Sequence, residues 1–168
     1  MLNPSMKLSR KGLDLIKSFE GLALHAYRDT GNVVTIGYGH TLTAKMGQVI
    51  TRDEAEKLLL EDVAKAEREV NSVVCVTLTQ GQFDALVSFE FNTGGLVLLT
   101  AKGRERPSKL LEYLNSGAVE YAAGQFMAWV YDNGRRLEGL VRRRNAERDL
   151  FVDGLKDGPK DGPKEGTQ

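Results

Sequence analysis

The chain has 168 residues, which is enough for one domain or for two small lobes that share a core. A hydrophobic fraction of 41% and a charged fraction of 27% are ordinary for a globular protein and exclude a disordered or membrane-embedded chain. Lys plus Arg and Asp plus Glu both number 23, so the net charge is zero. Without the basic excess typical of nucleic-acid binding, we expect no nucleic-acid partner.

The start of the chain predicts a helix followed by a small amount of β structure. Ser9 is a good N-cap, the helical pattern continues to Glu20, and Gly21 is a typical helix-ending residue. Strand-forming residues then lie on both sides of a turn cluster at 29–32. We therefore expect a β-hairpin or short sheet within residues 26–40.

A capping pattern at Thr51 and Glu54 begins a long helix. The threonine side chain and the glutamate three residues later can satisfy each other's backbone amides. Apolar residues follow at steps of four and three, which predicts one buried stripe on a helix of about residues 52–73. This helix would connect the β-rich part to the rest of the chain.

The remaining chain predicts further helices and a tail. A second cap at Thr79 begins a helix that Gly94 ends, and a loop is expected at 96–106. The shorter helices that follow are expected after Ser108, around 121–129 and at 137–152. Residues 157–163 repeat Asp-Gly-Pro-Lys and Asp-Gly-Pro, a sequence that cannot bury a core, which predicts a flexible, solvated tail at 153–168.

Cysteine usage and the N-terminus bear on the compartment. Cys75 is the single cysteine, so no intramolecular disulfide can form, and its place in the apolar run 73–76 predicts a buried thiol. The first residues lack the apolar core of a secretory signal, and no run approaches the roughly 20 apolar residues that span a bilayer. We expect synthesis as a soluble, reduced, cytoplasmic protein and no stable membrane insertion.

Glu20 is an unusual residue at the end of an apolar helix. The helix dipole presents partial negative charge there, so an ionised carboxylate is disfavoured and Lys or Arg would be stabilising. Desolvation by the apolar neighbours Phe19 and Leu22 would raise the pKa of Glu20 further. These are the conditions for a general acid near neutral pH, and a solvent-exposed glutamate is the alternative.

Asp29 follows nine positions later in the turn cluster. Alone, an aspartate in a turn caps its own backbone, but with Glu20 it forms a pair of carboxyls in contrasting environments, as glycoside hydrolysis requires. The hydroxyl of Thr35 can hold a water. Glycines at 37 and 39 would let a polymer lie close to the backbone, with a strand bulge as the alternative.

These residues resemble the catalytic signature of glycoside hydrolase family 24, the phage lysozymes or endolysins. Further blocks follow in the family's order, and the resemblance covers roughly residues 8–152. The segments that carry it are SFEG at 18–21, AYRD at 26–29, TIGYGHT at 35–41, VITRDEAEKLL at 49–59, QFDAL at 82–86, FNTG at 91–94 and RRRNAER at 142–148.

The resemblance implies an α+β fold that is mainly α-helical, with a β-hairpin lobe and a helical lobe facing each other across a cleft. The implied lysozyme domain is 1–152, with a β-rich lobe at about 20–50, an interlobe helix at about 52–73 and a helical lobe at about 79–152. The implied reaction is hydrolysis, with inversion, of the β-1,4 bond between N-acetylmuramic acid and N-acetylglucosamine in peptidoglycan. The implied role is host-cell lysis.

The resemblance also implies roles for individual residues. Glu20 matches the general acid, and Asp29 and Thr35 match the residues that orient or activate the attacking water. Arg142 matches the arginine that pairs with the catalytic glutamate, and Asn92 lies where the family lines the cleft floor. For Arg142 and Asn92, capping or surface solvation is the alternative.

A structural ion pair between His40 and Asp62 is implied in the same way, and such a pair raises the pKa of a histidine. The only other histidine is His25, which is too few for a histidine-built zinc site, so we expect no metal and no cofactor. Residues 96–106 exceed the family pattern. Their basic side chains would extend a cleft wall or contact an anionic wall polymer, or the segment is a solvated insertion.

Two other functions are weighed against a muramidase. A lytic transglycosylase cleaves the same bond without a water-positioning aspartate, so Asp29 and Thr35 disfavour it. A catalytically inactive, wall-binding scaffold would be expected to lose Glu20 or Asp29, and both are present. The expected partner is the peptidoglycan glycan strand, reached by a monomeric enzyme that a holin or other membrane damage releases to the periplasm and cell wall.

Overall fold

The computed structural model describes the chain over residues 5–156. Most of the predicted tail at 153–168 therefore lies outside the described residues. The last helix runs from Glu138 to Lys156, so residues 153–156, which were predicted to belong to the tail, are helical. The apolar residues Leu150 and Phe151 are buried on this helix, which anchors its last turns to the body of the protein.

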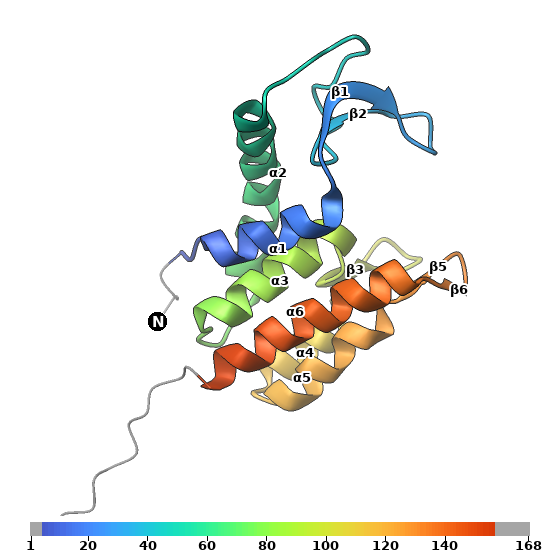
Figure 1. The fold of residues 1–168 in the computed structure, drawn as a ribbon. Coiled ribbons are helices and arrows are strands. Elements are labelled where there is room, and N and C mark those ends of the chain that lie inside the picture. Colours follow the sequence, from blue (N-terminus) through green and yellow to red (C-terminus); the bar gives the residue numbers. More distant parts are fainter. Residues whose placement is uncertain (1–4, 157–168) are drawn as a thin grey trace, which may run out of the picture.

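A small β-hairpin follows the first helix. Helix α1 (Arg10–Glu20) begins at Ser9, whose hydroxyl accepts the Gly12 amide, and it ends at Gly21. Strands β1 (Ala23–Arg28) and β2 (Val34–Gly37) then pair antiparallel, with a bulge in the register between Ala23 and Tyr27. The hairpin stands above the end of α1 and beside the start of the next helix (Figure 1).

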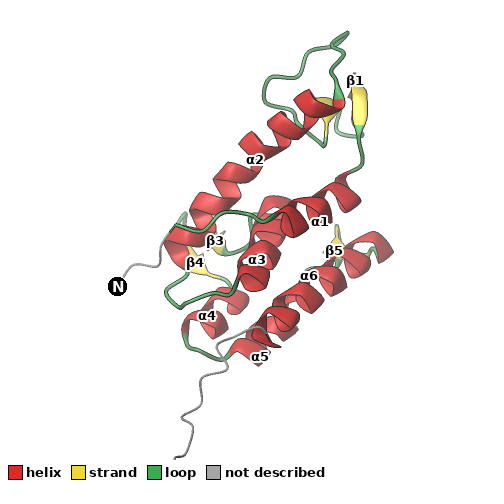
Figure 2. Ribbon diagram, turned by 60° about the vertical axis from the view of Figure 1, so that its left-hand side comes forward, coloured by secondary structure: helices red, strands yellow, loops and turns green. Residues whose placement is uncertain are grey.

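The long helix α2 (Arg52–Val73) has the predicted bounds. Thr51 and Glu54 form the predicted capping box, and the buried residues repeat at helical spacing along one side. One end of α2 lies beside the β1–β2 hairpin, and the other reaches the remaining helices (Figure 2). The helix therefore joins the two parts of the fold.

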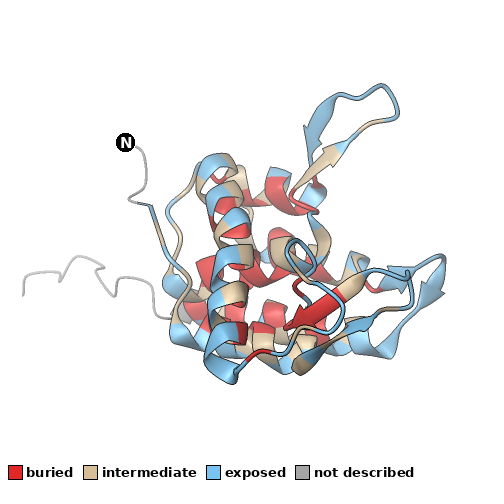
Figure 3. Ribbon diagram, turned by 90° about the horizontal axis from the view of Figure 1, so that it is seen from above, coloured by how far each residue is buried: buried red, intermediate tan, exposed pale blue. Residues whose placement is uncertain are grey.

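Helix α3 (Gln80–Thr93) lies at the centre of the helical part. Eight consecutive residues, 82–89, are buried, because α1, α2 and α6 (Glu138–Lys156) all pack against it. Helices α4 (Lys109–Asn115) and α5 (Val119–Gln125), with a short 3₁₀ turn at Phe126–Ala128, complete this body. Buried residues gather where the helices face one another and along strand β2, while the other strands are exposed or half-buried (Figure 3).

Two further hairpins complete the described chain. The segment predicted as a loop forms strands β3 (Val97–Leu99) and β4 (Glu105–Pro107), and β5 (Tyr131–Asp132) pairs with β6 (Arg135–Arg136). In the first of these hairpins, the Arg104 amide donates to the Thr100 hydroxyl at 3.1 Å, and Gly103 takes a φ of 70°. This local turn chemistry is why residues 96–106 are ordered as a hairpin. The predicted mainly helical α+β fold is confirmed.

Candidate active site

Glu20 is the last residue of α1, and its carboxyl is partly exposed. Its Oε1 accepts a hydrogen bond from Arg143 Nη1 at 2.6 Å, within an ion pair between the two ends of the chain. Its Oε2 lies near Gly39, which follows strand β2 of the hairpin. A Cβ atom built on Gly39 would be 3.7 Å from this oxygen. Gly21 takes a φ of 67°, which ends the helix and leaves the carboxyl at its tip.

A pocket of about 630 Å³ adjoins Glu20. It lies between the end of α1, the end of α3 and the start of α6, and its size is typical of small-molecule sites. Neither Asp29 nor Thr35 lies on its wall. The residues that line it are Ser18, Phe19, Glu20, Asn92, Leu137, Glu138, Gly139, Leu140, Arg142 and Arg143.

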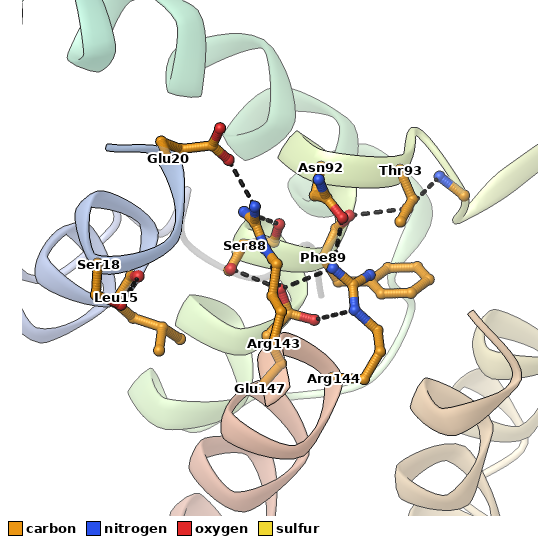
Figure 4. A network of polar contacts seen from close by, with 11 residues as sticks. Leu15, Ser18, Glu20, Ser88, Phe89, Asn92, Thr93, Arg143, Arg144 and Glu147 are labelled. Carbon is orange, nitrogen blue, oxygen red and sulfur yellow. Dashed lines mark hydrogen bonds and ion pairs between the residues drawn. The ribbon is translucent and has the colours of Figure 1, made fainter. Parts of the chain in front are cut away.

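A network of buried charges lies directly behind Glu20 (Figure 4). Arg143 donates from Nε to Glu147 Oε1 at 3.1 Å, and the Ser88 hydroxyl donates to the same oxygen at 2.7 Å. Arg144 lies 3.1 Å from Glu147 Oε2 and donates to Asn92 Oδ1 at 2.6 Å. The network therefore links α1, α3 and α6 around one carboxylate.

The partner of Glu20 is Arg143, so the prediction of Arg142 is wrong by one position. On α6, residues 143, 144 and 147 share the buried face, whereas Arg142 is exposed and contributes to the pocket rim. The three consecutive arginines carry the same charge, and only their helical phase separates the one that reaches Glu20. Asn92 lines the pocket, and its Oδ1 is held by Arg144; its contact with substrate stays a prediction.

Burial perturbs the charged groups of this network. Desolvation lowers the pKa of Arg144 to about 10, against the opposing influence of Glu147, so the guanidinium remains protonated at neutral pH. Desolvation also raises the pKa of the Glu147 carboxyl, while Arg144, Ser88 and Arg143 act to lower it. We regard Glu147 as ionised, because three donors or cations converge on it.

Asp29 and Thr35 lie on the β1–β2 hairpin. Asp29 Oδ1 accepts the amides of Gly31 and Val33 at 2.9 and 2.8 Å, so the carboxylate stabilises its own turn. Thr35 is buried, and its hydroxyl donates to the Val33 carbonyl at 3.2 Å. Both bonds to Asp29 use Oδ1, which leaves Oδ2 without a hydrogen bond to the described part of the chain.

His40 and Asp62 are in contact. His40 Nδ1 lies 2.8 Å from Asp62 Oδ2, and this contact ties the end of the β1–β2 hairpin to α2. The Thr43 amide donates to His40 Nε2 at 3.1 Å. A backbone amide is always a donor, so Nε2 accepts here and Nδ1 is the ring nitrogen that faces Asp62.

Three site residues escaped the sequence analysis: Ser88, Arg144 and Glu147. The available signal was the spacing on the last helix, where a glutamate follows two arginines by four and three positions. Ser88 carried no signal, because a serine in an apolar helix is also compatible with simple burial. Cys75 is exposed, so its predicted burial is wrong: it comes two residues after α2 ends, where the helical spacing no longer applies.

Residues 5–154 hold no cluster of three or more His, Cys, Asp or Glu side chains that could bind a metal ion. In the same part of the chain, no helix is long and apolar enough to cross a membrane. The arrangement is that of a lysozyme-type fold, with an acidic residue at a helix end beside a pocket and a small β-hairpin next to a helical body.

Comparison with known proteins places the chain in a family. The phage lysozyme family profile matches residues 17–147. The endolysin of Bacillus phage B103 is 44% identical over 152 residues, covering 89% of this chain and 55% of that protein. The endolysin of Acyrthosiphon pisum secondary endosymbiont phage 1 is 43% identical over 150 residues, covering 87% of this chain and 98% of that protein.

Solved structures of phage endolysins have a similar fold. The endolysin from Escherichia coli O157:H7 phage FAHEc1 is 40% identical, with a TM-score of 0.76 over 89% of this chain and 96% of that chain. The chain belongs to the phage lysozyme family, as predicted. It spans about half the length of the Bacillus phage relatives that it matches.

Proposed function

We propose that the protein is an endolysin, a muramidase that hydrolyses the β-1,4 bond between N-acetylmuramic acid and N-acetylglucosamine in peptidoglycan. The observation that carries this proposal is the placement of Glu20, which projects from a helix end onto the wall of a pocket of about 630 Å³. Membership of the phage lysozyme family supports the substrate class.

In this proposal Glu20 is the general acid. Arg143 already occupies Oε1, so the proton that is transferred sits on Oε2, which faces Gly39 and the hairpin. Glu20 gives this proton to the glycosidic oxygen as its bond to the anomeric carbon breaks. The carboxylate that remains is then balanced by the guanidinium of Arg143.

Asp29 and Thr35 position the attacking water from the hairpin. The turn fixes Asp29 through Oδ1, and Oδ2 is the oxygen that would take a proton from the water. Attack on the face opposite the leaving group inverts the anomeric centre. For an inverting pair, the two carboxyls are expected to lie about 6.5–9.5 Å apart in the substrate complex.

The test is the release of reducing ends from purified peptidoglycan. We expect Glu20→Gln to lower the rate at least a hundredfold, the usual range for loss of a general acid, and Asp29→Asn to impair it strongly. Leu42→Gln, an exposed change, is the matched control and should leave the rate unchanged. Wild-type protein that binds the wall but releases nothing would instead support the scaffold.

The products distinguish hydrolysis from the transglycosylase reaction. Hydrolysis adds water and leaves a reducing N-acetylmuramic acid end, whereas a transglycosylase forms an anhydro sugar that is lighter by one water. Mass spectrometry separates the two, and anhydro products would overturn the roles of Asp29 and Thr35.

The biological setting is also part of the proposal. We propose host-cell lysis by a monomeric enzyme that is made in the host cytoplasm and reaches the wall after a holin or other agent permeabilises the membrane. Expression with and without a co-expressed holin tests this. Lysis without any holin would show that the protein has its own route across the membrane.

A further inference from the structure

The buried charges behind Glu20 do not balance by themselves. Arg143 and Arg144 are adjacent on α6 and are 4% and 0% exposed, and both contact the fully buried carboxylate of Glu147. Two cations and one anion leave one positive charge inside the protein. Glu20 is the carboxyl group that contacts Arg143 from the pocket side, so it lies next to this unbalanced charge.

We propose that Glu147 and Arg144 are positioning residues that orient Arg143 and set the pH range in which Glu20 keeps its proton. This inference rests on the proposed role of Glu20 as the general acid. Neither residue touches the pocket wall, so both act through Arg143 and Asn92.

The geometry shows how Arg143 is oriented. Its guanidinium offers Nε to Glu147 and Nη1 to Glu20, and its Nη2 lies 3.4 Å from the Ser88 carbonyl. A planar guanidinium held on two edges has little freedom to swing into the pocket. Glu147 therefore fixes the direction from which Arg143 meets Glu20.

The charge of Glu147 opposes that of Arg143. Arg143 favours the ionised form of Glu20, which cannot donate a proton. Glu147 offsets this influence, while Arg144 adds to it. Removing the charge of Glu147 should therefore make Glu20 lose its proton at lower pH, and removing the charge of Arg144 should do the reverse.

The other charged groups near Glu20 do not supply this balance. On α6, Glu138 and Arg142 share the pocket wall, but both are exposed and of opposite sign. On α1, Lys17 is paired with Glu56 of α2. On the hairpin, Asp29 makes its hydrogen bonds within its own turn and none to Glu147 or Arg144.

The packing of the network also favours a role beyond stability. Arg144 Nε and Nη1 and Glu147 Oε2 lack hydrogen-bond partners among the described residues, although the two side chains lie in ionic contact. Buried ion clusters of this kind add little net stability compared with apolar packing. Orientation and charge are then what the cluster supplies.

The experiment measures the pH dependence of peptidoglycan hydrolysis in three variants. In Glu147→Gln the side chain keeps its shape and loses its charge, and we expect the alkaline fall of activity to begin at least about 0.5 pH unit lower, a threefold change in proton binding. In Arg144→Met we expect it to begin at higher pH. Glu147→Asp keeps the charge and should restore a profile close to wild type.

Each outcome decides the proposal. The proposal is supported if the alkaline fall of activity begins at lower pH in Glu147→Gln and at higher pH in Arg144→Met. Superimposable pH profiles in folded variants, with only melting temperature or overall rate changed, would overturn it and leave a structural role. If Glu147→Gln does not fold, the displacement in Arg144→Met decides. Glu20→Gln run in the same assay tests the proposed function separately, because activity in that variant would remove Glu20 as the acid.

Discussion

Replacing His40 with asparagine should lower stability and leave the cleavage reaction intact. The imidazole joins the end of the β1–β2 hairpin to α2 through Asp62, and it does not line the pocket beside Glu20. An asparagine amide is too short to reach both Asp62 and the Thr43 amide. The variant should therefore loosen the attachment of the hairpin without altering the residues that we propose for catalysis.

The magnitude follows from the contacts that are lost. A hydrogen bond to a charged group contributes about 1.5–3 kcal/mol, and the partial exposure of Asp62 places this one in the lower half of that range. Loss of the acceptor for the Thr43 amide adds about 1 kcal/mol. The expected total is about 2–3 kcal/mol, or a fall of roughly 5–10 °C in Tm for a chain of this size.

Urea unfolding at pH 7 and a double-mutant cycle with Asp62→Asn measure this effect. A coupling energy of about 1–2 kcal/mol between the two positions is expected, because each single variant removes the same contact. Activity is assayed well below the lower Tm. A coupling energy near zero would refute the argument that the His40–Asp62 contact stabilises the fold, and an inactive variant with native stability would show that His40 acts in catalysis.

Three further predictions concern groups outside the site. Lys17 lowers the pKa of Glu56, so this contact stabilises the protein above the ordinary value of 4.5 and is lost as pH falls; Glu56→Gln should be less stable than wild type at pH 7 and equal to it near pH 3, as followed by urea unfolding. Burial raises the pKa of Glu90, so its ionisation costs stability as pH rises above 4.5. Glu90→Gln keeps the acceptor for the Leu96 amide and should gain stability relative to wild type between pH 4 and pH 8; a constant difference in thermal melts would contradict this. Cys75 should react stoichiometrically with a thiol reagent in the native state, with Cys75→Ser as the blank, and protection until unfolding would show that it is buried.

Local chemistry made much of the fold predictable. Ser9, Thr51 and Thr79 each cap a helix at the predicted residue, because an N-cap depends only on neighbours three positions away. The β3–β4 hairpin was missed because its turn depends on one threonine hydroxyl and one glycine, and because the second strand, Glu105–Pro107, has weak strand propensity. The helical end of the predicted tail was missed because its composition hides the packing of Leu150 and Phe151.

The site was predictable only in part, for a physical reason. Glu20 was conspicuous because an acid at the C-terminal end of a helix opposes the helix dipole. The group that compensates for it, Arg143, lies 123 positions away, and only the phase of α6 distinguishes it from Arg142 and Arg144. A phase error of one residue on a helix rotates a side chain by about 100°, which is the difference between the pocket rim and the buried network.

The two influences on Glu20 act in opposite directions, and this is what the sequence alone did not reveal. The end of α1 disfavours the carboxylate, whereas Arg143 favours it. An acid that must give up a proton and take it back in each cycle needs both forms to be accessible at one pH. In the proposed mechanism, the position of Glu20 at a helix end and the charge pattern on α6 therefore act on the same carboxyl group. Only folding brings these two parts of the sequence together.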